Sequence, residues 1–192
     1  MIKKPVLMIH EVFDDIFKLD LQNYLLTFDD ALYSQFYHYS KISKIQTNKI
    51  FFVSTNILSE SRQSNNFVSC TEAHKKAFDG NKEDYMNIEQ IKFLMNEHDV
   101  EIGAHSHNHR RLSKFKSLKD KIDHIKKDTE LMLDWFKQNL NYTPKKFCFP
   151  YNEDLDGIYK LLLKKYGFEQ FYGNERLDIN HLLENTSLND SA

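Results

Sequence analysis

The sequence predicts a single-domain α/β protein built on a largely parallel sheet. Short apolar runs alternate along the chain with longer amphipathic segments. Strands separated by helices are the pattern of βα units, whose strands run parallel. The chain has 192 residues, which suffices for one sizeable domain and is short for two.

Seven apolar runs predict the strands. They lie at residues 6–9, 24–28, 49–54, 100–104, 146–149, 168–171 and 176–179. The run at 49–54 is rich in the β-branched and aromatic residues that strands favour. The carboxyl ends of parallel strands meet at one edge of a sheet, and binding sites in such folds form there. Polar residues that follow these runs are therefore the first candidates for a site.

Four amphipathic segments predict helices, at residues 31–45, from Asn87 onward, at 118–140 and at 155–166. Asn87 can cap its helix, because Gln90 stands at the capping-box position. The segment 118–140 carries the clearest apolar stripe. Gly167 stands where a helix commonly ends.

Two segments lack a regular pattern. Residues 59–82 are polar and without period, and they are too many for a simple connection. We interpret them as an excursion that is either a lid or substrate loop, or a solvated insertion without a role. Residues 182–192 are predicted to be a frayed polar tail, which leaves 1–181 as the domain.

Composition excludes several classes of protein. The net charge of −2 gives no field that draws the chain to nucleic acid or an anionic membrane. No segment reaches the roughly 20 apolar residues of a membrane span, and the apolar run near the N-terminus stops at His10, too early for a signal core. We expect a cytoplasmic protein. Cys70 and Cys148 lie far apart without a C-x-x-C pattern, so free thiols are favoured over one disulfide.

A pair of acidic residues, Asp29 and Asp30, ends the predicted strand 24–28. Adjacent carboxylates repel each other, so a cation or hydrogen bonds must offset that cost. Successive residues of a strand point to opposite sides, which lets the two carboxylates hold different roles. The alternative is a helix N-cap followed by a first-turn acid.

Three histidines follow the predicted strand 100–104. His105 and His109 are spaced i, i+4, and on a helical turn both imidazoles would face one ion. His107 is not expected to be a ligand. A solvated histidine loop is the alternative, but two histidines plus one carboxylate form the open site that catalytic zinc uses. The second carboxylate is then free to act as a base, which is hydrolytic chemistry.

At these residues the sequence resembles the polysaccharide deacetylases, carbohydrate esterase family 4. The similar segments are an opening strand at 6–10, a first motif at 26–30, a second at 101–112 and a third at 147–151. The third resembles a variant in which an aromatic residue replaces arginine before Pro150-Tyr151. The resemblance implies a distorted (β/α)7 barrel.

The resemblance also implies an activity, namely metal-dependent removal of an acetyl group from an N-acetylated or O-acetylated sugar in surface glycan or polysaccharide biosynthesis. Asp29 would be the general base, and Tyr151 would help to stabilise the oxyanion through its amide. One divalent ion, expected to be Zn²⁺, would be bound by Asp30, His105 and His109. Ser106 would support the loop.

Three departures from the family pattern carry expectations of their own. Ala31 replaces a common glycine, so we expect helical backbone there. Phe149 stands where many members have arginine, which would leave Asp29 without that charge. The late Leu-x-His motif that supplies the general acid is absent, so His181, His10 or a water is expected in its place.

Other functions stay open. The chain could be a metal-binding, carbohydrate-binding relative with little or no activity, or an amidohydrolase that acts on a non-sugar amide. The basic run 110–127 shows neither the aromatic interleaving nor the motif of a nucleic-acid reader, so a solvated helix face is the favoured interpretation. Its start lies near the predicted site, which leaves a phosphate-bearing sugar substrate open.

Overall fold

The computed structural model describes residues 4–60 and 63–189. Seven strands form one sheet in the order β6-β5-β4-β3-β2-β1-β7, and every neighbouring pair runs parallel. The strands are β1 (Val6–Ile9), β2 (Leu25–Phe28), β3 (Lys49–Val53), β4 (Val100–Ala104), β5 (Lys146–Cys148), β6 (Gln170–Tyr172) and β7 (Leu177–Asp178).

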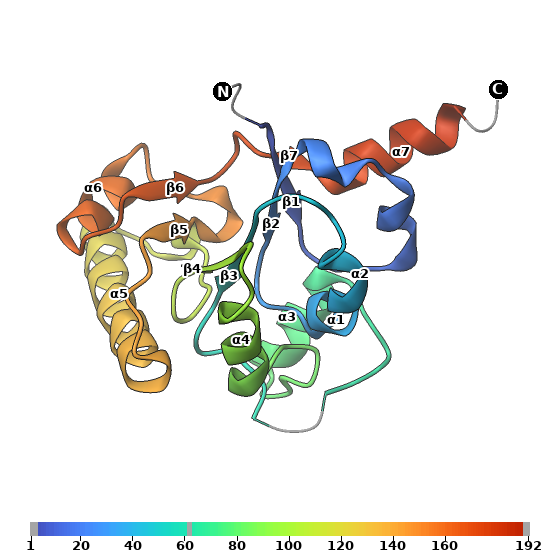
Figure 1. Ribbon diagram of the computed structural model, residues 1–192. Helices are drawn as coiled ribbons and strands as arrows, with labels where there is room; N and C mark the ends of the chain where they lie inside the picture. The colour runs from blue at the N-terminus through green and yellow to red at the C-terminus, as the bar shows by residue number, and fades with distance from the viewer. Residues whose placement is uncertain (1–3, 61–62, 190–192) are drawn as a thin grey trace.

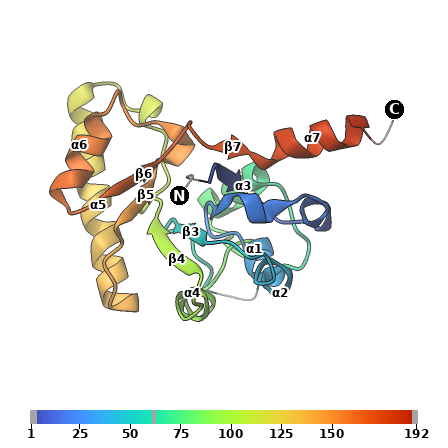
Figure 2. The same ribbon diagram turned by 45° about the horizontal axis from the view of Figure 1, so that its top comes forward.

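The sheet curls, but within the described part of the chain its two edge strands, β6 and β7, do not pair with each other. Both views show the sheet curving between helices on its two sides (Figures 1 and 2). The predicted distorted seven-stranded barrel in a single α/β domain is therefore confirmed, with an opening between β6 and β7. Each predicted strand matches its observed counterpart to within two residues at either end.

Seven α-helices surround the described sheet. They are α1 (Tyr33–Tyr37), α2 (Tyr39–Ile42), α3 (Cys70–Phe78), α4 (Ile88–Met95), α5 (Leu118–Leu140), α6 (Ile158–Lys165) and α7 (Ile179–Asn189). Helices α5 and α6 lie together beside β5 and β6, whereas α7 extends away from the sheet after β7 (Figures 1 and 2). Within the described ranges, no helix is both long enough and apolar enough to cross a bilayer.

Local signals that involve only neighbouring residues are confirmed. Helix α5 spans the predicted residues 118–140. The capping box of α4 is complete, because the Asn87 side chain accepts from the Gln90 amide at 3.0 Å and the Gln90 side chain accepts from the Asn87 amide at 2.9 Å. The predicted helix 155–166 is shorter, since α6 begins at Ile158 after the left-handed Gly157.

The predicted helix at 31–45 is wrong at its start, and the structure divides the rest at His38 into α1 and α2, the second of which ends at Ile42. Asp30 (φ 73°) and Ala31 (φ 59°) are left-handed, so the helical backbone expected at Ala31 is absent. Two hydrogen bonds to the segment between α3 and α4 hold this turn. Met86 N donates to the Ala31 carbonyl at 2.8 Å, and Tyr33 N donates to the Asp84 carbonyl at 2.7 Å. Such backbone costs about 1–3 kcal/mol for a non-glycine residue and is typical of functional sites.

The two segments predicted to be irregular both contain a helix. Helix α3 lies inside the excursion at 59–82, where Ser69 caps it by accepting from the Glu72 amide at 3.3 Å. The predicted polar tail is helical up to residue 189 as part of α7, and Leu182 and Leu183 pack against the core. Residues 182–189 are thus helical, while residues 190–192 and 61–62 lie outside the described residues.

The main core lies between the sheet and its helices. Apolar side chains of adjacent strands pack across it, and the rings of Phe28 on β2 and Phe51 on β3 stack at 4.5 Å. Burial of a large apolar side chain contributes about 1.5–3 kcal/mol. This packing fixes the ends of β2 and β4, which carry the acidic pair and the histidine loop.

Candidate metal and catalytic centre

One cavity, of about 550 Å³, gathers the polar residues that follow the strands. All five residues with a predicted catalytic or metal-binding role line it: Asp29, Asp30, His105, His109 and Tyr151. A second cavity, of about 600 Å³, opens at the other end of the sheet, where Val6, Lys49 and Val100 begin their strands. We assign the site to the first cavity, because sites of parallel sheets form at the carboxyl ends of the strands.

Three imidazoles surround one oxygen of the Asp30 carboxylate. Asp30 Oδ1 lies 3.0 Å from His109 Nε2, 3.3 Å from His105 Nε2 and 3.4 Å from His74 Nε2. The two Nε2 atoms of His105 and His109 are 3.1 Å apart. All four side chains are buried. The structure thus brings the predicted donors Asp30, His105 and His109 together and adds His74.

Hydrogen bonds to carbonyl oxygens fix how two of these rings are protonated. His105 Nδ1 lies 2.8 Å from the Cys148 carbonyl and His74 Nδ1 lies 3.0 Å from the Cys70 carbonyl. A carbonyl oxygen only accepts hydrogen bonds, so each Nδ1 carries the proton. When such a ring is neutral, its Nε2 has a lone pair that faces the Asp30 carboxylate. Asp30 Oδ1 and His74 Nε2 are buried without a hydrogen-bond partner. Nitrogen lone pairs and a carboxylate oxygen that face one another can all bind the same cation. These residues are therefore suited to a metal ion.

The pKa directions of Asp30 and His109 agree with that fit. Burial by itself would raise the pKa of Asp30, but the neighbouring histidines outweigh it and hold the pKa well below its ordinary value. Burial lowers the pKa of His109 to about 4 and outweighs the attraction of Asp30. An anionic carboxylate and a neutral imidazole are the forms in which these side chains bind metals. At His105 and His74 burial would lower the pKa, but neighbouring groups, the Asp30 carboxylate among them, outweigh it and raise the pKa, so a bound ion would take the place of a proton there.

The histidine loop after β4 is not the helical turn that the i, i+4 spacing predicted. Ser106 (φ 68°) and His109 (φ 49°) are left-handed, and this backbone nevertheless turns both imidazoles to Asp30. Ser106 supports the loop as expected, because its Oγ accepts from the His109 amide at 2.9 Å. His107 points away from the cluster, with Nδ1 2.8 Å from Thr55 Oγ1.

A buried carboxylate on α5, which sequence reasoning missed, anchors the same loop. Asp128 accepts from the amides of His107 at 2.7 Å and Asn108 at 2.9 Å, and also from the Asn108 side chain. Its position in an amphipathic helix gave no signal, because a carboxylate there is ordinarily solvated. Asp128 therefore links the longest helix to the geometry of the site.

Asp29 has an arginine partner, contrary to the expectation from Phe149. The Arg176 guanidinium donates two hydrogen bonds to the Asp29 carboxylate, each of 2.8 Å, and both side chains are buried. Burial would raise the pKa of Asp29, but the charge and hydrogen bonds of Arg176 outweigh it, so the pKa is lowered. The predicted loss of a tuning charge is wrong, because a residue just before β7 supplies one.

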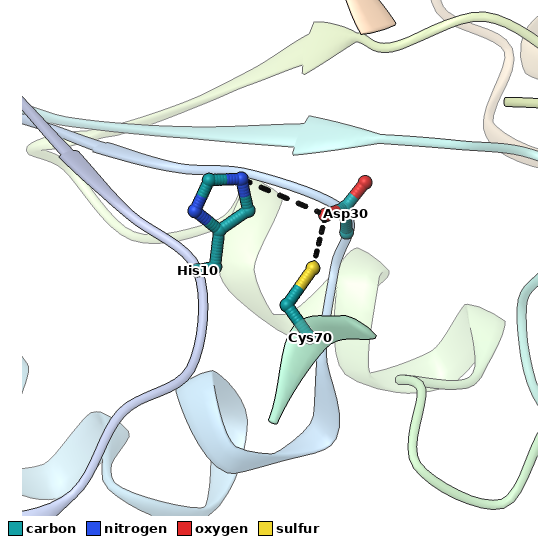
Figure 3. Close-up of side chains that lie close together, drawn as sticks. All are labelled: His10, Asp30 and Cys70. Carbon is teal, nitrogen blue, oxygen red and sulfur yellow. Dashed lines mark hydrogen bonds and ion pairs between the residues drawn. The ribbon is translucent and has the colours of Figure 1, made fainter. Parts of the chain in front are cut away.

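Of the two histidines considered as the general acid, His10 lies in the cavity. His10 Nε2 is 3.9 Å from Asp29 Oδ2 and 4.0 Å from Asp30 Oδ2, and the side chain is 30% exposed. Figure 3 shows His10 and Cys70 both turned toward Asp30, with the Cys70 thiol 3.2 Å from Asp30 Oδ2. His181 is exposed on α7 and does not line the cavity. The geometry therefore favours His10.

Tyr151 and helix α3 form further parts of the cavity wall. Tyr151 is left-handed (φ 54°), and its ring lies 4.7 Å from that of His109 and under the Arg111 guanidinium.

Cys70 and His74 come from α3 at i, i+4 spacing. The signal that could have found α3 was Ser69 followed three residues later by Glu72, an N-terminal helix signature. Cys70 and Cys148 are both free thiols, as predicted.

The fold and the donor set define an α/β barrel protein with a buried histidine–carboxylate centre beside a second carboxylate. The family model "Polysaccharide deacetylase" matches residues 20–171. The chain belongs to this family. The match includes both aspartates, the histidine loop and Tyr151, and it ends before Arg176.

Solved structures show the same fold at low sequence identity. IcaB from Ammonifex degensii is 18% identical, with 92% of this chain and 85% of that chain covered and a TM-score of 0.65. The Streptococcus pyogenes deacetylase PplD in complex with acetate is 14% identical, with 87% and 81% covered and a TM-score of 0.61. BC0361, a polysaccharide deacetylase from Bacillus cereus, is 10% identical, with 91% and 64% covered and a TM-score of 0.64. No curated protein matches the sequence significantly.

Proposed function

We propose that this protein is a metal-dependent hydrolase that removes an acetyl group from an N-acetylated or O-acetylated sugar during the synthesis of a surface glycan. The observation that carries the proposal is the pair of adjacent buried carboxylates with different surroundings. Asp30 faces three imidazole nitrogens, whereas Asp29 is paired with Arg176. One carboxylate is thus suited to a metal ion and the other to proton transfer.

Asp30, His105 and His109 would hold the ion, and their N/O donor set suits Zn²⁺. A divalent ion there supplies Lewis-acid chemistry, polarising a carbonyl and lowering the pKa of a water. The Cys148 carbonyl fixes the His105 ring, and Ser106 holds the backbone of His109, so these two residues need little rearrangement on binding.

Asp29 would act as the general base. The charge of Arg176 keeps its carboxylate ionised, and an ionised carboxylate can accept a proton from the attacking water. Asp29 Oδ1 retains acceptor capacity beyond its bond to Arg176, whereas Oδ2 also accepts from the Cys148 thiol at 3.4 Å. Removal of a general base typically costs 10²–10⁴-fold in rate.

His10 and Tyr151 would act on the acyl and leaving groups. His10 lies at the partly exposed side of the cavity and is placed to donate a proton to the departing amine or alcohol. The Tyr151 amide, in its left-handed turn, would donate to the oxygen on which negative charge develops. Both roles depend on a substrate carbonyl that lies between Asp29 and the Asp30 cluster.

The cavity rim supports a sugar substrate. Phe78 on α3 is 54% exposed and lines the cavity, and an exposed aromatic face suits a pyranose ring. The name of BC0361, a polysaccharide deacetylase, agrees with this substrate class, and that of PplD, a deacetylase in complex with acetate, agrees with deacetylation.

The test is acetate release from a panel of N-acetylated and O-acetylated sugars and of non-sugar acetamides. The protein is assayed after metal removal and after reloading with zinc. The proposal predicts metal-dependent release from at least one sugar. Release only from non-sugar acetamides would favour a general amidohydrolase, and retained metal without any release would favour a non-catalytic relative.

A further inference from the structure

We propose that His74 on helix α3 is a fourth protein ligand of the metal centre. The inference rests on the proposed centre of Asp30, His105 and His109, and it adds a donor from a segment that the sequence showed only as irregular. The first observation is distance, since His74 Nε2 lies 3.4 Å from Asp30 Oδ1, close to the 3.3 Å of His105 and the 3.0 Å of His109.

These separations suit donors that share one ion. With Zn–N and Zn–O bonds of about 2.0–2.1 Å, two donors of a tetrahedral site lie roughly 3.3 Å apart. The His105–His109 separation of 3.1 Å is of the same size. Asp30 Oδ1, His74 and His109 also form a group whose donor atoms all lie within 4.8 Å of one another. His74 therefore lies at ligand distance from Asp30 and in one group of donors with His109.

The orientation of the ring gives independent support. His74 Nδ1 lies 3.0 Å from the Cys70 carbonyl, which can only accept, so in the neutral ring Nδ1 donates and the Nε2 lone pair faces Asp30. That Nε2 is buried and has no hydrogen-bond partner. The ring stacks on His109 at 4.3 Å with an angle of 20° between the planes. A metal-binding histidine characteristically donates its other N–H to a carbonyl in this way.

Helix α3 holds His74 in place. Ala73 and Ala77 are buried against Leu32 and Tyr85, and Ser69 caps the helix. Because a packed helix presents the ring, the fourth donor does not depend on loop closure. A four-donor centre should bind its ion more tightly than a three-donor centre, and it leaves fewer positions at the ion for water and substrate.

The test compares zinc affinity in wild type, His74→Ala, His74→Gln and His107→Ala, by competition between apoprotein and a chromophoric chelator. Loss of an outer partner of a zinc ligand typically costs about 10–100-fold in affinity, so loss of a ligand should cost at least as much. We expect this loss in both His74 variants and none in His107→Ala, whose ring points to Thr55. X-ray absorption of the zinc-loaded protein should count three imidazoles in wild type and two in His74→Ala.

The glutamine variant separates coordination from positioning, because its amide can still donate to Asp30. Wild-type affinity in His74→Gln, or only two imidazoles around zinc in wild type, would overturn the fourth ligand while leaving the three-donor centre intact. A wild-type protein that binds no zinc would remove the centre and the fourth ligand together. If His74→Ala does not fold, the count of imidazoles in wild type decides.

Discussion

Arg176 and Asp29 are separated by 147 residues in sequence and joined by two hydrogen bonds of 2.8 Å. Asp29 follows β2, whereas Arg176 stands between β6 and β7, the two edges of the curled sheet. The Arg176 guanidinium also donates to Thr27 Oγ1 at 3.0 Å. The connection across the opening of the barrel thus supplies the charge that stabilises the proposed base.

Replacement of Arg176 by glutamine should destabilise the fold and weaken the base. Loss of one partner from a buried ion pair typically costs about 3–5 kcal/mol. The exposed pair Lys145–Glu169 gives a matched control, and Lys145→Gln should cost no more than about 1 kcal/mol. Chemical denaturation of the metal-free proteins measures both. Equal effects of the two substitutions would show that the buried pair has no special role.

The same Arg176→Gln variant should have a distinct pH dependence. Folding lowers the pKa of Asp29, so the ionised carboxylate stabilises the folded protein at any pH above 3.8, its ordinary pKa. This contribution is lost as pH falls through the lowered pKa. The gap in unfolding free energy between wild type and variant should be largest near neutral pH and shrink below about pH 4. The acidic limb of the pH–rate profile should lie at higher pH in Arg176→Gln than in wild type. A gap that is independent of pH would contradict the assignment.

The two adjacent carboxylates should respond differently to removal of charge. Asp29→Asn should keep the metal and lose about 10²–10⁴-fold in rate, because only the base is lost. Asp30→Asn should weaken metal binding itself, since Asp30 Oδ1 faces the imidazoles. Metal content by elemental analysis, measured beside the rate, distinguishes them. Metal loss in Asp29→Asn with full activity in Asp30→Asn would reverse the roles.

The general acid should be His10 rather than His181. His10→Ala should remove the alkaline limb of the kcat profile and leave metal content unchanged, because a protonated donor is needed for the leaving group. His181 is exposed on α7, so His181→Ala should leave the profile as it is in wild type. An unaltered profile in His10→Ala would transfer the role to a water.

Gly103 on β4 should tolerate no side chain. It pairs with Phe52 on β3, and an added Cβ would overlap the Phe52 ring and lie 3.3 Å from the Lys146 carbonyl. Overpacking of this kind costs about 1–3 kcal/mol, so Gly103→Ala should lower Tm. Phe52→Leu should recover part of the loss in the double variant. Strictly additive effects would mean that the two residues do not meet.

Local and pairwise patterns were predictable from the sequence. Strands and helix α5 follow from apolar periodicity, and α4 from its capping residues. The rule that sites form at strand ends places Asp29, Asp30, His105 and His109 at one edge of the sheet from the sequence alone. Each of these inferences needs only residues close in sequence, or the topology of the sheet.

Contacts between distant segments were not predictable in this way. Arg176 reaches Asp29 because the sheet stays open between β6 and β7, which no periodicity reveals. Ala31 is left-handed because carbonyl and amide groups near residue 85 bind the turn. His74 enters the site because α3 folds back over the cavity. In each case tertiary contacts outweigh local preference.

The most direct test of the account is a zinc titration of the metal-free protein, with acetate release from an N-acetylated sugar oligomer as the readout. If the Asp30 cluster holds the one ion required for hydrolysis, activity should rise with added zinc and level off at one equivalent. The His105→Ala/His109→Ala variant should stay inactive throughout. Activity that is independent of zinc, or equal in wild type and the double variant, would contradict the account.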